Sequence, residues 1–172
     1  MGSPDGREAW TVPSPRDSCH VGIGEICVSY SPDVLVALAL GSCVGVAIYD
    51  PVRRMGGLAH VMLPCPTDAH PSATLDRFAS YAVPYLVRRL SVDGASDRLT
   101  ARIVGGAAMF ASDSAMAGIG QRNADEARRQ LVLAGVPVLA EDIGSNHART
   151  MEFYLETGKV LARSYRYGIK EL

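Results

Sequence analysis

A cysteine and a histidine in two neighbouring apolar segments are the strongest candidates for chemistry in this chain. Cys43 lies in the run LGSCVGVAIYDP, and His60 lies in the run GGLAHVMLP, after a short polar turn. A thiol and an imidazole that meet in space form a nucleophile and its base. The backbone N–H groups of Ser42 and Cys43 are then candidates to hold a developing oxyanion.

Each of these two residues also has a purely structural interpretation. Free cysteine is among the most buried residue types, so Cys43 fits a packed strand. His60 fits a core histidine whose ring nitrogens bond to backbone groups. The glycines at 41 and 45 favour chemistry, because they let a substrate or another backbone approach closely.

A metal site is a further alternative. Cys43, His60, Cys65 and His70 are four possible zinc ligands within 28 residues. Structural zinc sites favour closely spaced ligand pairs, and the sequence has no such pair. The spacing therefore argues against a metal, and the thiol chemistry itself requires no cofactor.

Hairpin geometry decides whether the thiol and the imidazole can meet. Residues 44–49 and 58–63 are rich in strand-forming types, and residues 50–57 carry turn chemistry. In a hairpin the numbers of opposed residues have a constant sum, and for Cys43 and His60 this sum is 103. A register sum of 103 or 105 places both side chains on one face of the hairpin, whereas an even sum places them on opposite faces. A bulge near the turn would change that parity.

The remaining segments predict one α+β domain with a mixed or antiparallel sheet. We expect residues 1–18 to be poorly ordered and residues 19–172 to form the single domain. Further strands are expected at 21–30, 34–40, 99–104, 136–140, 151–156 and 160–167. Helices are expected at 75–92, where Pro84 should kink the helix or delay its start, and at 123–134, with Asp125 and Glu126 in its first turn.

Several loop residues and the other cysteines are also assigned. Gly105 and Gly106 after a strand indicate a tight turn, because no phosphate-binding motif follows them. Arg122, Asn123 and Asn146, in loops or at a helix start, are candidates for contact with a substrate. Residues 141–149 read as a polar loop. Cys19, Cys27 and Cys65 are expected to be buried without a chemical role.

Composition narrows the partners and the compartment. The net charge is −1, and no basic stripe is present, which argues against nucleic acid. The longest apolar run, residues 34–49, is shorter than the roughly 20 residues of a membrane span. The N-terminus lacks the plan of a signal peptide, and the four cysteines lack close spacing, so we expect a cytoplasmic protein.

Four blocks together resemble CheD, the bacterial chemoreceptor glutamine deamidase. They are the Cys43–His60 region, IVGGAAMF (103–110), IGQRNADEARRQL (119–131) and AEDIGSNHARTMEFYLETGKV (140–160). The resemblance runs from about residue 21 to the C-terminus. It implies hydrolysis of glutamine side-chain amides in methyl-accepting chemotaxis receptors, without a cofactor, and a CheC-type phosphatase as partner. It also implies layered mixed sheets flanked by helices, similar to the catalytic fold of the cytotoxic necrotizing factor toxins.

The same resemblance implies a role for each site residue. Cys43 would be the nucleophile, His60 the general base, and a thioester the intermediate. The family usually has a threonine six positions before the cysteine, where this chain has Ala37. Alanine cannot orient an imidazole by a hydrogen bond. This departure keeps a second hypothesis open, in which the protein is a non-catalytic CheD-like module that binds receptors or CheC.

Overall fold

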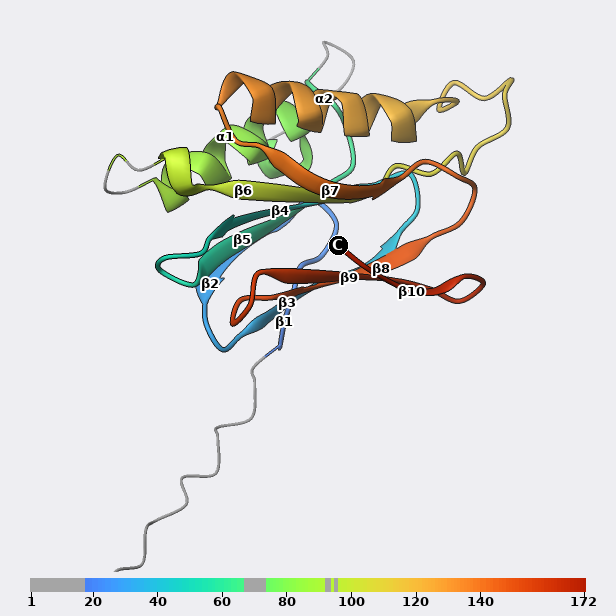
Figure 1. The fold of residues 1–172 in the computed structure, drawn as a ribbon. Coiled ribbons are helices and arrows are strands. Elements are labelled where there is room, and N and C mark those ends of the chain that lie inside the picture. Colours follow the sequence, from blue (N-terminus) through green and yellow to red (C-terminus); the bar gives the residue numbers. More distant parts are fainter. Residues whose placement is uncertain (1–17, 67–73, 92–93, 95) are drawn as a thin grey trace, which may run out of the picture.

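The computed structural model describes residues 18–66, 74–91, 94 and 96–172. In these residues two five-stranded sheets lie face to face, and two α-helices cover the free face of one of them (Figure 1). We call the sheet beneath the helices the central sheet and the other the outer sheet. Both sheets contain parallel and antiparallel pairs. The predicted α+β class, with layered mixed sheets flanked by helices, is confirmed.

The central sheet has the order β2-β5-β4-β6-β7. Its strands are β2 (Ile26–Tyr30), β4 (Val44–Asp50), β5 (Met55–Val61), β6 (Thr100–Gly105) and β7 (Val138–Ile143). All neighbours are antiparallel except β6 and β7. Every residue of β4 is buried, because helices cover one face of the sheet and the outer sheet covers the other.

The outer sheet has the order β1-β3-β8-β9-β10. Its strands are β1 (Ser18–His20), β3 (Val34–Leu40), β8 (Arg149–Tyr154), β9 (Lys159–Ser164) and β10 (Gly168–Glu171). β1 pairs with β3 in parallel, and the other neighbours are antiparallel. In β8 buried and half-buried residues alternate, which is the pattern of a sheet with one face on a core.

Two hydrophobic cores separate the three layers. The first lies between the central sheet and the helices α1 (Ala79–Leu90) and α2 (Ile119–Leu133). The second lies between the two sheets, and we call it the sheet core. Because side chains alternate along a strand, Val46 and Ile48 of β4 face the helices while Ala47 and Tyr49 face the sheet core.

The single strand expected at 21–30 is wrong. The chain forms β1 in the outer sheet and β2 in the central sheet, and residues 21–25, which we call the crossing segment, connect the two. Gly24 in this segment has a φ of 77°, a conformation that interrupts a strand. Of the expected strand, residues 26–30 are confirmed as β2, and the apolar pattern did not reveal that residues 21–25 cross from one sheet to the other.

The second helix begins earlier than the sequence indicated. Gly118, with a φ of 70°, precedes it, so Asp125 and Glu126 lie beyond the first turn and the expected interaction with the helix dipole is wrong. The two carboxylates instead form ion pairs with arginines three residues later on the same helix. Gly135, with a φ of 70°, follows the end of this helix, which is a common way for a helix to stop.

The other boundaries differ from expectation by short lengths. The helix expected from residue 75 starts as a 3-10 turn (Leu75–Arg77), and α1 follows at Ala79. Pro84 lies inside α1, so it does not set the start of the helix. A further 3-10 turn (Ser96–Arg98) precedes β6. The strand expected at 160–167 ends at Ser164 as β9, and β10 follows it as a further strand that was not expected. The disorder expected at 1–18 falls outside the described residues except for Ser18, and the single-domain assignment stays a prediction.

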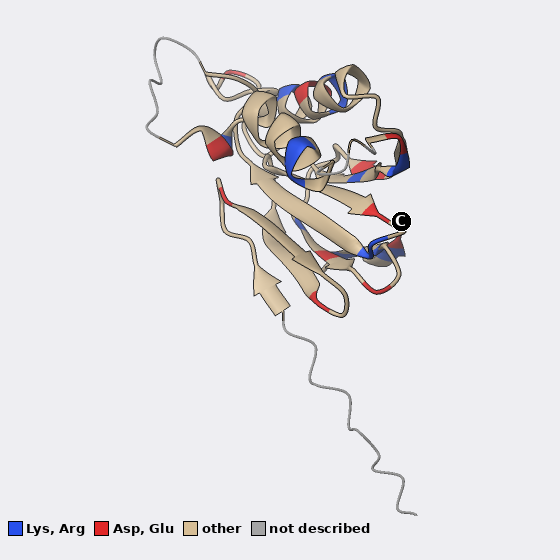
Figure 2. Cartoon of the chain, turned by 90° about the vertical axis from the view of Figure 1, so that its left-hand side faces the viewer, with Lys and Arg blue, Asp and Glu red and all other residues tan. Residues whose placement is uncertain are grey.

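Charged residues of both signs are interspersed over the helices and the strand ends, and the sheet ribbons between them are mostly uncharged (Figure 2). Among the described residues, no helix combines the length and the apolar character that crossing a bilayer requires.

Candidate active site

The hairpin of β4 and β5 brings Cys43 and His60 to one face of the central sheet. Gly45 pairs with His60, and Val44 pairs with Val61, so the register sum is 105. This odd register confirms that the two side chains share a face. Cys43 directly precedes β4, lies diagonally across from His60, and packs against the sheet core.

The His60 ring is held by a backbone group. Its side chain is buried, and its Nδ1 atom lies 3.1 Å from the carbonyl oxygen of Val21. A carbonyl only accepts hydrogen bonds, so in the neutral ring Nδ1 carries the proton and Nε2 carries the lone pair. Among the described residues, Nε2 is buried without a hydrogen-bond partner.

The crossing segment that supplies this carbonyl is itself fixed to both sheets. The N–H group of Val21 donates to the carbonyl of Val36 in the outer sheet, at 2.8 Å. The N–H group of Gly24 donates to the His60 carbonyl at 2.8 Å, and the His60 N–H group donates to Glu25 at 3.0 Å. Backbone and ring of His60 are therefore anchored to the same five residues.

The environment favours the uncharged forms of both groups. Burial raises the pKa of the Cys43 thiol. Burial also lowers the pKa of His60, although the hydrogen bond to Val21 and the nearby Glu25 carboxylate act in the opposite direction. No hydrogen bond joins the Cys43 thiol to the free Nε2 among the described residues. Both pKa shifts therefore favour an uncharged thiol and an uncharged imidazole.

The loop that carries Cys43 is shaped by close backbone contacts. Gly106 donates to the Cys43 carbonyl, and Ala107 donates to the Gly41 carbonyl, both at 2.8 Å. A Cβ atom on Gly105 would lie 2.3 Å from the Cys43 carbonyl oxygen, closer than atoms can approach. Gly105, the last residue of β6, and Gly106 have φ values of 112° and 66°, which favour glycine, but no turn forms there as the sequence predicted.

On the other side of Cys43, an irregularity in β3 directs the chain into this loop. The pairing of β3 with β8 shifts between Ala37 and Leu40. Ala39 has a φ of 53°, and its carbonyl accepts a hydrogen bond from the Gly41 N–H group at 2.8 Å. This bulge bends the strand just before Cys43.

Asn123 lies inside the fold and bonds to two distant backbone carbonyls. It is buried in α2, and its side-chain amide donates to the carbonyls of Ser42 at 2.9 Å and Met62 at 3.0 Å. Of the two expected positions, a loop or a helix start, the second agrees with α2, and the side chain connects the segments that follow Leu40 and Val61. Sequence reasoning missed this role because the partners are 81 and 61 residues away.

The backbone groups proposed for the oxyanion remain available. Within the described part of the chain, the N–H groups of Ser42 and Cys43 donate to no protein acceptor. Both residues are partly exposed. Free N–H groups next to a thiol are what an oxyanion site requires.

The other expected contact residues lie on the surface. Arg122 is exposed in α2, not in a loop, and lines a pocket of about 360 Å³ together with Cys65 and Met116. Asn146 is exposed in the connection between β7 and β8. A second pocket, of about 210 Å³, reaches His60 and is bordered by Val21, among others.

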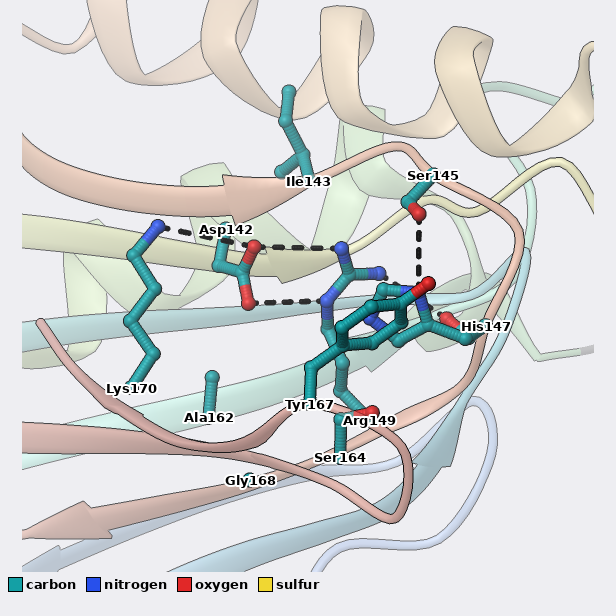
Figure 3. Close-up of a pocket in the computed structure, with 10 residues that line it drawn as sticks. All are labelled: Asp142, Ile143, Ser145, His147, Arg149, Ala162, Ser164, Tyr167, Gly168 and Lys170. Carbon is teal, nitrogen blue, oxygen red and sulfur yellow. Dashed lines mark hydrogen bonds and ion pairs between the residues drawn. The ribbon is translucent and has the colours of Figure 1, made fainter.

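Arg149 organises the loop that was expected to be merely polar. It is buried and contacts Asp142 through two nitrogens at 3.1 and 3.3 Å (Figure 3). It also donates to the carbonyls of Gly144 and His147. The loop in turn bonds to the Gly105–Ala108 stretch, because Gly144 donates to the Gly105 carbonyl at 3.0 Å. Through this loop, Arg149 supports the stretch whose Gly106 N–H group donates to the Cys43 carbonyl.

The described residues give no support to the zinc alternative. No group of three or more histidine, cysteine, aspartate or glutamate side chains gathers there, and His70 lies outside that part of the chain. Cys65 is exposed, so its expected burial is wrong. Cys19 and Cys27 are half-buried, and their sulfur atoms lie 2.6 Å apart.

Comparisons with known proteins bear on this geometry. Residues 62–164 match the family model described as CheD chemotactic sensory transduction. A relative from Geobacter metallireducens, "Probable chemoreceptor glutamine deamidase CheD 2", is 44% identical over 88% of this chain and 96% of its own length. One from Clostridium novyi, "Probable chemoreceptor glutamine deamidase CheD", is 38% identical over 91% and 99%. One of the same name from Caldanaerobacter subterraneus is 37% identical over 88% and 95%.

A solved structure is also similar. It is titled as a hypothetical protein YfiH of Bacillus licheniformis, with a TM-score of 0.42 and 19% identity over 70% of this chain and 51% of that one. A similarity of this degree does not establish a shared fold or function.

Proposed function

Because the chain belongs to the CheD family, we propose that it hydrolyses the side-chain amides of glutamines in methyl-accepting chemotaxis receptors, with Cys43 as nucleophile and His60 as general base. The relatives' names supply the reaction and the substrate class. The observation that carries the residue assignment is the Nε2 atom of His60. It is buried without a partner among the described residues, on the sheet face that it shares with Cys43.

The pKa directions support general-base activation. A thiol with a raised pKa is not ionised at neutral pH, so His60 must remove its proton as the sulfur attacks. A neutral imidazole with a free Nε2 lone pair can accept that proton. The developing imidazolium keeps its second N–H group on the Val21 carbonyl, which stabilises the charge.

The reaction then proceeds in two steps. The Cys43 sulfur attacks the glutamine side-chain carbonyl, and the oxyanion accepts hydrogen bonds from the Ser42 and Cys43 N–H groups. His60 returns its proton to the departing ammonia and leaves a thioester. The same histidine activates a water molecule, which hydrolyses the thioester to glutamate and restores the thiol.

Ala37 does not remove the orienting group from this scheme. The family threonine would orient the histidine, and here the Val21 carbonyl already accepts a hydrogen bond from Nδ1. Ala37 itself is fully buried in the sheet core. This observation favours catalysis over the alternative of a binding module without activity.

We place this reaction in the cytoplasm, where the signalling domains of such receptors present their glutamines. The family resemblance further suggests a CheC-type phosphatase as a partner. Co-purification of the full chain with a CheC-type protein tests this association separately from catalysis.

The decisive experiment incubates the full chain with receptor fragments and locates conversion of glutamine to glutamate by mass spectrometry. We expect conversion by the wild type and none by Cys43→Ala. His60→Gln should reduce the rate by a factor of about 10²–10⁴, the usual worth of a general base. Absence of conversion by the wild type would favour the binding module, and conversion by Cys43→Ala would refute the nucleophile.

A further inference from the structure

Two cysteines outside the reaction scheme lie side by side at the edges of the two sheets. Cys19 is in β1, the edge strand of the outer sheet, and Cys27 is in β2, the edge strand of the central sheet. Their sulfur atoms are 2.6 Å apart, about half an ångström more than a disulfide bond. Both side chains pack against the sheet core.

The strand pairing explains why the two thiols meet. Cys19 pairs with Leu35, and Cys27 pairs with Leu58, and both leucines are fully buried in the sheet core. The two cysteine side chains therefore point into the same space from opposite sheets. A bond between the two sulfur atoms would therefore link the outer sheet to the central sheet.

We propose that Cys19 and Cys27 form a reversible disulfide that fastens the crossing segment and, through it, the ring of His60. The cross-link closes a loop that contains all of residues 21–25. These are the residues that hold the Nδ1 atom, the carbonyl and the N–H group of His60. The disulfide stands on the cysteine geometry alone, and only its meaning for catalysis rests on the proposed function.

The oxidant is a low-molecular-weight disulfide such as oxidised glutathione. The Cys19 sulfur attacks one glutathione sulfur, which breaks the glutathione S–S bond and releases one thiol. The Cys27 sulfur then attacks Cys19 in the mixed disulfide and releases the second thiol. The protein loses two electrons and two protons, which leave on two molecules of reduced glutathione.

The local chemistry sets the order of these steps. Burial and the adjacent Cys19 thiol raise the pKa of Cys27 to about 12. A thiol with so high a pKa is a poor nucleophile. Cys19 therefore makes the first attack, on the glutathione disulfide. The closing step is intramolecular, because the two sulfurs are already neighbours.

The test treats the full chain with reduced or oxidised glutathione and measures the intact mass, the linked peptides and the melting temperature. We expect the oxidised wild type to lose the mass of two hydrogen atoms and to yield one cross-linked pair, Cys19 with Cys27. Its Tm should rise by about 5–10 °C, as expected for a short closed loop in a domain of this size. Reduction should reverse both changes.

A double variant, Cys19→Ala with Cys27→Ala, provides the matched control. It retains Cys43 and Cys65, so any mass loss or Tm increase that persists in it overturns the assignment. A wild type that stays fully reduced in excess oxidised glutathione also overturns it, as does a cross-link that involves Cys43 or Cys65.

Amide hydrogen exchange tests the connection to His60. The N–H groups of Gly24 and His60, which bond between the crossing segment and β5, should exchange about tenfold more slowly in the oxidised wild type. The double variant should show no difference between the two treatments. A disulfide that forms without slowing these two amides would refute the proposed effect on the crossing segment.

Discussion

The Nδ1 atom of His60 lies 3.1 Å from the carbonyl oxygen of Val21, a backbone group 39 residues earlier in the chain. This contact determines which ring nitrogen carries the proton, and it leaves the lone pair on Nε2. A backbone carbonyl thereby performs the orienting task that a side-chain hydroxyl or carboxylate performs in many hydrolases. Because no side chain is involved, substitution at position 21 leaves the group in place.

The first prediction concerns the pH dependence of deamidation. Activity requires neutral His60, whose pKa burial holds below its ordinary 6.5, so the acidic limb of kcat/KM should lie below pH 6.5. It also requires the Cys43 proton, whose pKa burial raises above 9.0, so the alkaline limb should lie above pH 9. A pH profile with receptor fragments gives both limbs.

A resting thiolate–imidazolium pair would give a different profile. In that case the alkaline limb would report loss of the imidazolium proton and would fall near neutral pH or slightly above it. The ultraviolet absorbance of a thiolate at pH 7, present in the wild type and absent in Cys43→Ala, would likewise contradict general-base activation.

The second prediction concerns the position of the family threonine. Ala37 is fully buried and pairs with Met151, so Ala37→Thr adds a methyl and a hydroxyl group to a packed core. We expect the free energy of unfolding to fall by about 1–3 kcal/mol. The deamidation rate should not increase, because the Val21 carbonyl already orients His60. Denaturant unfolding and kcat measure the two effects.

Ala37→Val is the matched control, because valine has nearly the shape of threonine without its hydroxyl. If Ala37→Thr raises kcat above the wild type while Ala37→Val does not, the hydroxyl orients His60 and the Val21 contact is insufficient.

The third prediction identifies Asn123 as a positioning residue. Its side-chain amide donates to the Ser42 and Met62 carbonyls from a buried site. Asn123→Ala removes both bonds, and the unfolding free energy should fall by about 2–4 kcal/mol. Because Ser42 adjoins the proposed nucleophile, kcat should also fall about tenfold or more, with KM within twofold of the wild type, at temperatures where the variant is folded.

Gln121→Ala is the control on the same helix, since Gln121 is exposed and its side-chain amide donates to Asp125 at the helix surface. This variant should change neither the free energy of unfolding nor kcat measurably. An Asn123→Ala variant that loses stability but keeps the wild-type kcat would show that the residue supports the fold alone.

These residues also show how far the sequence could predict the site. Alternation along a strand placed Cys43 and His60 on one face for any odd register, and the register is 105. The partner of Nδ1 could not be predicted, because a carbonyl carries no sequence signal. The crossing segment that positions it was interpreted as part of a continuous strand.

Asn123 and the cysteine pair escaped prediction for a related reason. Local pattern indicates which element a residue belongs to, but not which distant loop that element contacts. Asn123 lies 81 residues from Ser42, and the contact depends on how α2 packs over the central sheet. Cys19 and Cys27 are close in sequence, yet they meet only because their strands join different sheets.

The fourth prediction tests the close backbone contact beneath Cys43. A Cβ atom at position 105 would lie 2.3 Å from the Cys43 carbonyl oxygen, and Gly105 has a φ of 112°. Gly105→Ala should therefore lower the free energy of unfolding by more than about 3 kcal/mol. Gly135→Ala is the control, because Gly135 also has a positive φ but open space around its Cβ position. Equal losses in the two variants would show that backbone strain alone, without the contact, explains the effect.

The fifth prediction concerns the bulge that precedes Cys43. Ala39 is exposed and has a φ of 53°, a conformation that costs an L-residue roughly 1 kcal/mol and costs glycine little. Ala39→Gly should raise the free energy of unfolding by about 0.5–1 kcal/mol in denaturant titrations. Ala111→Gly provides the comparison, because Ala111 is also exposed but has a negative φ, so glycine there should be neutral or destabilising. If Ala39→Gly destabilises the protein as much as Ala111→Gly does, the left-handed conformation of the bulge is not a source of strain.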